Sequence, residues 1–544
     1  MTIRQQPKGT QAGVAAANSS RSMSHPLRIE KLRTRAAPLD MTSDQFRSLG
    51  HDLVDRIAEF LASLRTHPVT RAESPEEVRA ALHADRALPE QGQNIQSLLG
   101  DTAALLFEHS LFNGHPRFYG YITSSAAPVG MLADFLAAAV NANVGAWKLA
   151  PVASEIESQV IRWLAQFIGY PADCGGLLLS GGNMANLTCF LTARAAQAGW
   201  DIRKQGVASG PRLCVYASSE THTWLQKAAD LSGLGTEVIH WIDGRQGMDL
   251  DELQARYRRD RDDGYQPFLV VGSAGTVSTG AVDPLPDLAA FCQEHKLWFH
   301  VDGTYGAFAC GLEGTPPELA ALQSADSVAV DPHKWLYAPL EAGCALVRDP
   351  LALRNAFSYH PPYYSFDGEG MNYYDIGPQN SRGFRALKVW LALQQAGAAG
   401  YREMIQDDIT LARHLYNLAV DHPELQALTH HLSITTLRYV PQEFRAALWS
   451  EATEKYLNEL NRRLMEAIEK SGEAFISNAV IAGKYALRFC IVNFRACADD
   501  IEAMPQLIAR FGRRVHAELM SSPTGAGEFV PEGADAAHIR VNRG

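Results

Sequence analysis

The chain has 544 residues, 46% of them hydrophobic and 20% charged, a balance typical of a folded globular protein with two or three domains. Its formal net charge of −11 argues against broad electrostatic capture of nucleic acid. No apolar run reaches the ~20 residues that a helix needs to cross a bilayer. The eight cysteines are scattered and lack C-x-x-C pairs, which favours reduced thiols over a metal or disulfide framework. We therefore expect a cytoplasmic protein that acts on a small molecule, with neither nucleic acid nor a membrane as partner.

The first two segments of the chain differ in composition. Residues 1–40 are predicted to form a disordered leader, because they are polar and the first 29 include no acidic residue. A transit peptide has a similar composition, but no amphipathic stripe is visible here. Residues 41–125 are predicted to be a helical N-terminal segment, whose first helix begins at Thr42 or Ser43. The apolar face of that helix consists of Phe46, Leu49, Leu53, Ile57 and Phe60.

Residues 126–390 alternate short apolar runs with helical patterns. The runs are GLLLS, RLCVYAS, TEVIHWI, PFLVVGSAG, LWFHVDG, SVAVD and CALVRD. This alternation is typical of an α/β domain with a mainly parallel central sheet covered on both faces. The binding site of such a sheet lies at the carboxyl ends of its strands. Residues 391–544 are predicted to form a smaller C-terminal α+β domain, with strands in SITTLRYV and YALRFCIVNF.

A glycine turn follows the first strand of the predicted sheet. GLLLS runs directly into GGNMANL, so Gly181, Gly182 and Asn183 lie at the N-terminus of a helix. Free backbone N–H groups and the helix dipole suit such a turn for binding phosphate. On its own the signal is weak, because Gly-Gly turns are more often structural and neither a Walker A motif nor G-x-G-x-x-G is present.

Three reactive side chains follow other strands at the same predicted edge. Asp302 ends an apolar strand in HVDGTYG, His222 follows another in ETHTW, and Lys334 lies in DPHKW between two apolar runs. Each has a structural explanation by itself: a loop-capping acid, a packing histidine and a structural lysine. Together with the glycine turn they match what pyridoxal phosphate needs: a phosphate cradle, a carboxylate for the pyridine nitrogen, a flat ring for stacking, and an amine that condenses with the aldehyde. We therefore predict pyridoxal 5'-phosphate as the cofactor.

Several motifs occur in an order that resembles one known family. They are HPRFYGY, WKLAPVASEIE, SGGNMAN, ETHTW, HVDGTYG, DPHKWLYAPLEAG and RGFRALKVW. From about residue 45 to 495 the chain resembles the group II pyridoxal-phosphate-dependent amino-acid decarboxylases, which include aromatic-L-amino-acid, histidine and glutamate decarboxylases. The resemblance implies a type I pyridoxal-phosphate-dependent transferase fold and an intertwined homodimer with its active sites at the subunit interface.

The resemblance also implies roles for single residues. Lys334 matches the lysine that binds the cofactor covalently, Asp302 the acid at the pyridinium nitrogen, and His222 the histidine that stacks on the ring. Gly182 and Asn183 match the phosphate-binding turn.

Further positions follow from the same motifs. His333, next to the lysine, matches another phosphate contact. Val277 departs from the family pattern, because several members have a threonine there; Ser278 and Thr279 could supply a hydroxyl, but no cofactor contact is assigned to them. Tyr363 in HPPYYS best matches a loop tyrosine implicated in protonating Cα, with a packing role as the plain alternative.

The substrate is less well defined by the sequence. HPRFYGYITSS resembles the segment that lines the substrate side chain in the aromatic enzymes, so candidate pocket residues are Tyr121, Ile122, Ser124 and, from GAWKLAP, Trp147. An apolar and aromatic wall favours an aromatic substrate. We predict decarboxylation of an L-amino acid, preferably aromatic, to the amine and carbon dioxide. The alternatives are an acidic or diamino-acid decarboxylase, an oxygen-dependent aldehyde synthase, and an inactive cofactor-binding partner protein.

Overall fold

The structure is a computed structural model that describes residues 25–35, 37–244, 247–359, 370–447 and 450–521. The chain divides into two compact units. The first consists of Met1–Leu61 with Glu90–Ala104, and the second of Ala62–Pro89 with Leu105–Gly544. No helix among the described residues is both long and apolar enough to cross a membrane.

The amphipathic pattern near the N-terminus forms α2 (Ser43–Ser63), and α4 (Ile95–His109) begins in the same unit. Thr42 is the cap of α2. The amide of Gln45 donates to Thr42 Oγ1 at 3.2 Å, and Gln45 Oε1 accepts from the amide of Thr42 at 2.9 Å. This reciprocal pair is a capping box, which satisfies two N–H groups that the first turn would otherwise leave without partners.

The disorder predicted for residues 1–40 is wrong for one stretch, because α1 (His25–Arg33) is helical. Its sequence contains leucine, arginine, glutamate and lysine, which have high helix propensity. Arg33 Nε also lies 2.7 Å from Glu30 Oε2, an i,i+3 ion pair that supports the helix. Residues 1–24 lie outside the described part of the chain.

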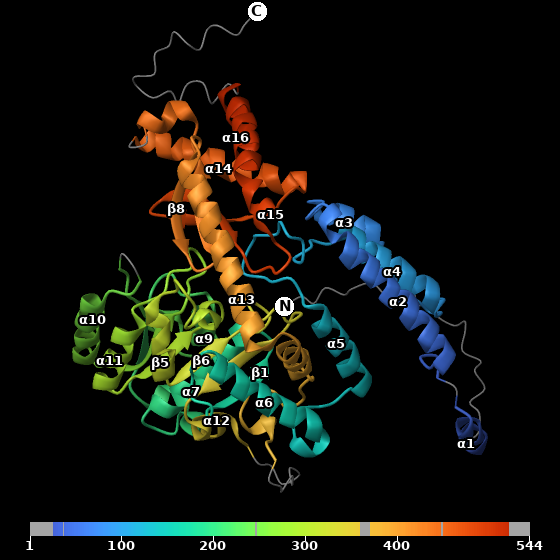
Figure 1. The fold of residues 1–544 in the computed structure, drawn as a ribbon. Coiled ribbons are helices and arrows are strands. Elements are labelled where there is room, and N and C mark those ends of the chain that lie inside the picture. The colour runs from blue at the N-terminus through green and yellow to red at the C-terminus, as the bar shows by residue number, and fades with distance from the viewer. Residues whose placement is uncertain (1–24, 36, 245–246, 360–369, 448–449, 522–544) are drawn as a thin grey trace, which may run out of the picture. The chain divides into compact units, whose positions relative to one another are not determined.

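A seven-stranded sheet forms the centre of the second unit (Figure 1). Its strands are β1 (Gly175–Leu179), β2 (Leu213–Ala217), β3 (Ile239–Trp241), β4 (Gln266–Ser273), β5 (Trp298–Asp302), β6 (Ser327–Val330) and β7 (Gly343–Val347). They lie in the order β1-β7-β6-β5-β4-β2-β3, and only β7 is antiparallel to its neighbours. Nearly every strand residue is buried, which explains the continuous apolar runs in the sequence. The predicted α/β fold with a mainly parallel sheet is confirmed.

Helices cover the sheet and place the turn after β1 at its edge (Figure 1). Those packed directly on the strands are α6 (Pro151–Phe167), α7 (Gly182–Gln197), α10 (Leu250–Asp262), α11 (Leu285–His295) and α12 (Pro350–Phe357). The other helices before β7 are α3 (Pro75–Leu82), α5 (Pro128–Val140), α8 (Ile202–Gln205) and α9 (Trp224–Leu231). Because α7 starts immediately after β1, its N-terminus lies at the carboxyl ends of the parallel strands.

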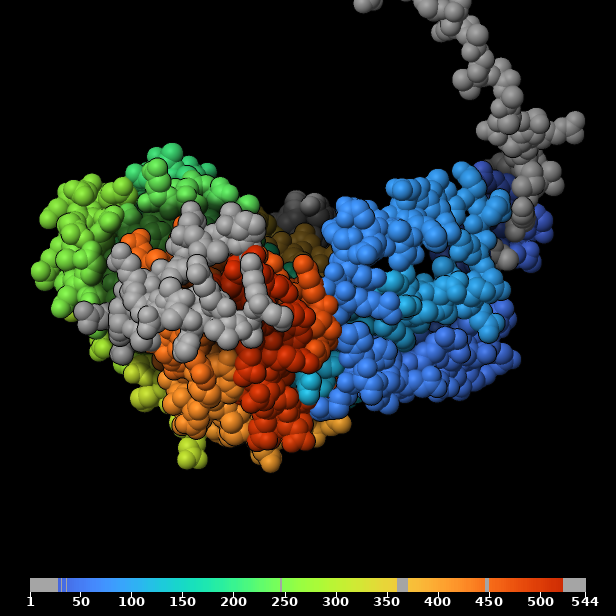
Figure 2. Space-filling view, turned by 90° about the horizontal axis from the view of Figure 1, so that it is seen from above, coloured from blue at the N-terminus to red at the C-terminus, as the bar shows by residue number. Residues whose placement is uncertain are grey.

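The C-terminal part of the chain forms a second, antiparallel sheet of four strands in the order β10-β11-β9-β8. These strands are β8 (Leu425–His431), β9 (Ile434–Tyr439), β10 (Ser477–Ile481) and β11 (Lys484–Cys490). The helices of this part are α13 (Ala386–Asp421), α14 (Glu451–Ser471), α15 (Ala498–Glu502) and α16 (Met504–Ser521). Seen from above, α16 forms much of the red surface beside the orange segments (Figure 2). The long helix α13 packs on β8 and β9 and also on α6, so it links this sheet to the large one.

Candidate active site

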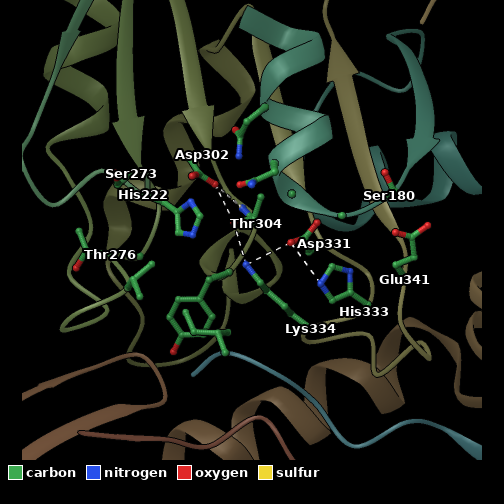
Figure 3. A pocket seen from close by; sticks show the side chains of 18 of the residues that line it. Ser180, His222, Ser273, Thr276, Asp302, Thr304, Asp331, His333, Lys334 and Glu341 are labelled. Carbon is green, nitrogen blue, oxygen red and sulfur yellow. Dashed lines mark hydrogen bonds and ion pairs between the residues drawn. The ribbon is translucent and has the colours of Figure 1, made fainter. Parts of the chain in front are cut away.

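A cavity of about 440 Å³ opens at the carboxyl ends of the parallel strands (Figure 3). Ser273 ends β4, Asp302 ends β5 and Asp331 follows β6, while the glycine turn comes from the end of β1. The cavity therefore lies at the edge where the sequence predicts the binding site. All six residues predicted to bind the cofactor line it: Gly182, Asn183, His222, Asp302, His333 and Lys334.

Lys334 is held in a compact turn, residues 332–338, which we call the lysine turn. Its amide donates to the carbonyl of Asp331 at 2.9 Å, and the amide of Tyr337 donates to the Lys334 carbonyl at 3.0 Å. The side chain points into the cavity, where Nζ donates to Thr304 Oγ1 at 3.1 Å and lies 3.3 Å from Asp331 Oδ2 (Figure 3). The turn thus presents one primary amine to the cavity.

Asp302 is buried at the end of β5 and stays ionised. Burial opposes its charge, but the positive charge of Lys334 and the hydrogen bonds from Thr304 outweigh burial and hold the pKa of Asp302 below its ordinary value. Thr304 donates to Asp302 Oδ1 at 2.8 Å, and Trp224 Nε1 donates to Oδ2 at 2.7 Å. These donors fix the direction of the carboxylate.

The imidazole of His222 lines the cavity beside Asp302 (Figure 3). The amide of Trp224 donates to His222 Nδ1 at 3.2 Å, so this nitrogen is unprotonated and Nε2 carries the proton. Burial lowers the pKa of His222, which keeps the ring neutral near pH 7. One residue, Trp224, therefore orients both the histidine and the acid, a role that sequence reasoning missed although ETHTW contains it.

The glycine turn has no room for larger side chains. A Cβ atom at Gly182 would lie 2.7 Å from Asp331 Oδ2 and 2.8 Å from Thr304 Cγ2, and Gly181 has a φ of 83°. Gly182 and Asn183 are the first residues of α7, whose N-terminal N–H groups have no partner within the helix. The turn can therefore bring backbone donors close to an anion.

His333 and Asp331 complete this side of the cavity. His333 Nδ1 lies 2.7 Å from the carbonyl of Ala342, and its Nε2 lies 3.6 Å from Asp331 Oδ2. Figure 3 shows Asp331 between His333 and Lys334. Asp331 Oδ1 is buried without a hydrogen-bond partner among the described residues. Sequence reasoning assigned no role to Asp331 or Thr304, because their significance depends on contacts across three loops.

Comparison with known proteins identifies the family. Residues 75–436 match the pyridoxal-dependent decarboxylase conserved domain. The chain belongs to this family. It is 32% identical to an aromatic-L-amino-acid decarboxylase of Bacillus atrophaeus, over 85% of this chain and 94% of the relative. It is also 31% identical to a phenylacetaldehyde synthase of Petunia hybrida, over 82% of this chain and 90% of the relative.

Solved structures give the same result. The crystal structure of Oryza sativa TDC with PLP and tryptamine superposes with a TM-score of 0.81 at 27% identity, covering 88% of this chain and 99% of that one. The family and the fold predicted from the motifs are both confirmed.

The cofactor of this family is pyridoxal phosphate, and the residues of the cavity fit it. Gly182 lies so close to Asp331 and Thr304 that a side chain is excluded at this position. The backbone N–H groups at the start of α7 can therefore bind a phosphate. Asp302 supplies an ionised carboxylate to the lining of the cavity, and Lys334 supplies the amine with which an aldehyde condenses. His222 offers a flat, neutral ring between them.

The four predicted substrate-pocket residues of this decarboxylase lie in different positions relative to the cavity. Ile122 lines the cavity. Ser124 is buried behind it and donates from Oγ to the carbonyl of His333 at 2.7 Å. Tyr121 is 62% exposed, and Trp147 donates from Nε1 to Glu155 at 2.8 Å in a separate surface depression. Within one chain, the structure therefore brings only Ile122 of these four to the cavity wall.

Two other predictions concern the loops around the cavity. Val277 does line it, and so does the neighbouring Thr276. Ser278 donates instead to Glu220, and Thr279 pairs with Thr276 at 3.1 Å. The predicted Tyr363 lies outside the described residues.

Proposed function

We propose that the protein catalyses the pyridoxal-phosphate-dependent decarboxylation of an L-amino acid, with aromatic substrates preferred, to the amine and carbon dioxide. The observation that carries this proposal is the convergence of Lys334, Asp302 and His222 on one cavity at the start of α7. When bound, the cofactor supplies an electron sink that makes loss of carbon dioxide possible. An aldehyde-forming relative in the same family supports one alternative, an oxygen-dependent aldehyde synthase.

Each residue of the cavity has a proposed task. Lys334 provides the amine that holds the cofactor and is released when substrate arrives. Asp302, ionised and fixed by Trp224 and Thr304, keeps a proton on the pyridine nitrogen. His222 packs its neutral ring on the cofactor, and the backbone of Gly182, together with Asn183 and His333, binds the phosphate.

The walls of the cavity support an uncharged substrate side chain. Ile122, Val277 and Leu340 give it apolar surface. Glu220 also lines it, and its negative charge would repel the side chain of an acidic amino acid, whereas the charge of Glu341 is paired with Arg385 at 2.8 Å. Both features favour an aromatic substrate over glutamate or aspartate. This agrees with the aromatic-L-amino-acid activity named for the Bacillus atrophaeus relative.

We further propose that Tyr363 donates the proton that Cα receives after carbon dioxide leaves. The support is its position in HPPYYS, and a tyrosine at this point favours the amine product over the aldehyde. The neighbouring Tyr359 is largely exposed, and the guanidinium of Arg203 lies 4.3 Å from the centroid of its ring.

We also propose a cytoplasmic homodimer. No side chain of α2 is buried although this helix is amphipathic, and α5 exposes several large apolar residues. The exposed apolar residues of α5 support a protein partner, and a second copy of the chain is the simplest one. A reducing compartment suits the eight cysteines, all of which are free thiols.

The test is a substrate screen with purified protein and added cofactor, in which amine, carbon dioxide, aldehyde and peroxide are all recorded. We expect amine and carbon dioxide in equal amounts from one or more aromatic L-amino acids. Borohydride reduction followed by peptide mapping should place the pyridoxyl group on Lys334. A label on another lysine would refute the assignment, and Lys334→Ala should abolish both labelling and turnover.

A further inference from the structure

Two side chains of the lysine turn donate hydrogen bonds to one buried carboxylate, that of Asp408. Trp335 and Tyr337 both follow Lys334 in sequence, at positions +1 and +3, and both side chains are fully buried. Trp335 Nε1 donates to Asp408 Oδ2 at 3.1 Å, and the hydroxyl of Tyr337 donates to the same oxygen at 2.7 Å. Asp408 lies on α13, about 70 residues further along the chain. A single oxygen thus binds two of the three residues that directly follow the lysine.

The other oxygen of Asp408 extends this connection to the C-terminal sheet. The backbone amide of Asn493, which follows β11, donates to Asp408 Oδ1 at 3.3 Å. Tyr401, also on α13, donates from its hydroxyl to the carbonyl of Leu336 at 3.0 Å. The lysine turn is therefore fixed by elements that form no part of the cavity wall.

The backbone of the turn needs such support. Tyr337 has a φ of 52°, a left-handed conformation that costs a residue with a side chain about 1 kcal/mol. The ring of Trp335 stacks on Tyr305 with centroids 4.7 Å apart, and Tyr305 lines the cavity. Any rotation of Trp335 would therefore disturb both the lysine and the cavity wall.

Burying the carboxylate of Asp408 costs folding free energy, so stability alone does not explain an acid at this position. Among the described residues it forms no ion pair with a lysine or arginine, and burial raises its pKa to about 7. A buried acid without a cationic partner usually costs more free energy than an apolar residue of the same size. Its geometry around Lys334 suggests what offsets that cost.

We propose that Asp408 is a positioning residue for Lys334: by holding Trp335 and Tyr337 it fixes the direction in which the amine of Lys334 enters the cavity. This inference rests on the proposed function, because it takes Lys334 as the residue that condenses with the cofactor. Asp408 itself lies outside the cavity lining and touches neither the phosphate turn nor Asp302.

The experiment compares Asp408→Leu with Asp408→Asn. Leucine has a similar size but removes both acceptor oxygens, whereas asparagine keeps one acceptor for the indole and the phenol. Apoprotein is mixed with pyridoxal phosphate, reduced with borohydride after increasing times, and the pyridoxyl label on Lys334 is quantified by peptide mapping. We expect labelling to slow about tenfold or more in Asp408→Leu, because a misdirected amine loses its favourable approach to the aldehyde. Asp408→Asn should recover most of the rate.

A second ligand separates positioning from general damage. Pyridoxamine phosphate has the ring and the phosphate but no aldehyde, so its affinity depends on the phosphate turn and on Asp302 and not on the direction of Lys334. Its dissociation constant should be unchanged in Asp408→Leu. The matched control is Asp407→Leu, which changes an exposed acid on the same helix and should label at the wild-type rate.

Each outcome decides the question. Wild-type labelling in Asp408→Leu overturns the inference, and so does an equal loss of pyridoxamine phosphate affinity, which indicates collapse of the whole site. If Asp408→Leu does not fold, the double variant Trp335→Phe with Tyr337→Phe is used in its place, because it removes both hydrogen-bond donors to Asp408. Labelling of this double variant at the wild-type rate overturns the inference. Absence of label on Lys334 in the wild-type protein instead refutes the proposed function.

Discussion

Asp302 combines a buried position with an ionised carboxylate. Burial alone would favour the neutral acid, yet Lys334 and Thr304 hold its pKa below the ordinary value. Two directed donors, Trp224 Nε1 and Thr304 Oγ1, leave the carboxylate little freedom to turn. A fixed negative charge at this wall is suited to holding a proton on the nitrogen of a bound pyridine ring.

Replacing that charge should stop turnover while sparing the fold. Asp302→Asn keeps the size of the side chain, but a neutral amide cannot hold the pyridinium proton electrostatically. We expect the turnover number to fall by on the order of 10²-fold or more, with circular dichroism and cofactor content close to those of the wild type. Near-normal turnover in a cofactor-loaded variant would show that Asp302 is only structural.

Tyr363 should control which product is released. Tyr363→Phe keeps the aromatic ring but removes the proton proposed for Cα, so carbon dioxide should still be released while the product shifts from amine towards aldehyde. The measurement is the ratio of amine to aldehyde, with oxygen uptake and peroxide, for one good substrate. Tyr359→Phe and Tyr364→Phe are the matched controls. Amine formation at the wild-type rate in Tyr363→Phe, together with loss in one control, would move the role to that tyrosine.

At the scale of elements, α13 couples the lysine turn to the C-terminal sheet through Asp408, and this should appear in the pH dependence of stability. Burial raises the pKa of Asp408 to about 7, against about 3.9 in an unfolded chain. Between these values the folded protein keeps a proton that the unfolded chain has lost, so the free energy of unfolding falls as the pH rises. The titratable groups that interact with it are Tyr337, Asp407 and Cys490; Tyr337 and Cys490 ordinarily titrate above this window, and burial raises the pKa of both further.

Asp408→Asn should remove this contribution. As the pH rises from about 4 to about 7, the free energy of unfolding of the variant should increase relative to that of the wild type by roughly 1 kcal/mol per pH unit. Urea unfolding of both proteins at several pH values and one protein concentration provides the comparison. Parallel stability profiles for the two proteins would contradict the raised pKa.

The elements differ in how far the sequence predicts them. All seven strands of the large sheet were predictable, because burial on both faces makes each a continuous apolar run bounded by turn residues. The strands β8 and β10 were missed. Each is an edge strand, and most of its residues are partly buried or exposed, so LQALTHH and SNAVI carry little apolar signal.

The site shows the same limit. Lys334, Asp302 and His222 were predictable because each lies at the end of a strand or within a few residues of one, at one edge of the sheet and in a distinctive motif. Trp224 and Asp408 were not, since each acts through a hydrogen bond to a residue distant in sequence. Side-chain partners of this kind depend on tertiary packing and leave no periodic pattern.

At the scale of the whole molecule, the apolar surface of α5 bears on assembly. Leu132, Leu136 and Val140 are each more than half exposed. Their spacing of four residues places them along one face of the helix, while Gly130 and Ala133 on another face are buried. An apolar stripe of this length exposed to water is typical of a surface that another protein covers.

Placing charges in this stripe should separate the subunits. In the double variant Leu132→Asp with Leu136→Asp, two carboxylates buried at the proposed interface would face the same residues of the partner across a twofold axis, a costly arrangement without cations. Sedimentation should then give the mass of one chain, where the proposed dimer should give two. The control is Leu351→Asp on α12, which is 64% exposed and adds a charge elsewhere without affecting assembly. Because the resemblance places the active sites at the interface, turnover should be lost with the dimer. A double variant that still sediments as a dimer would exclude α5 from the interface, and a fully active monomer would show that each subunit has a complete site.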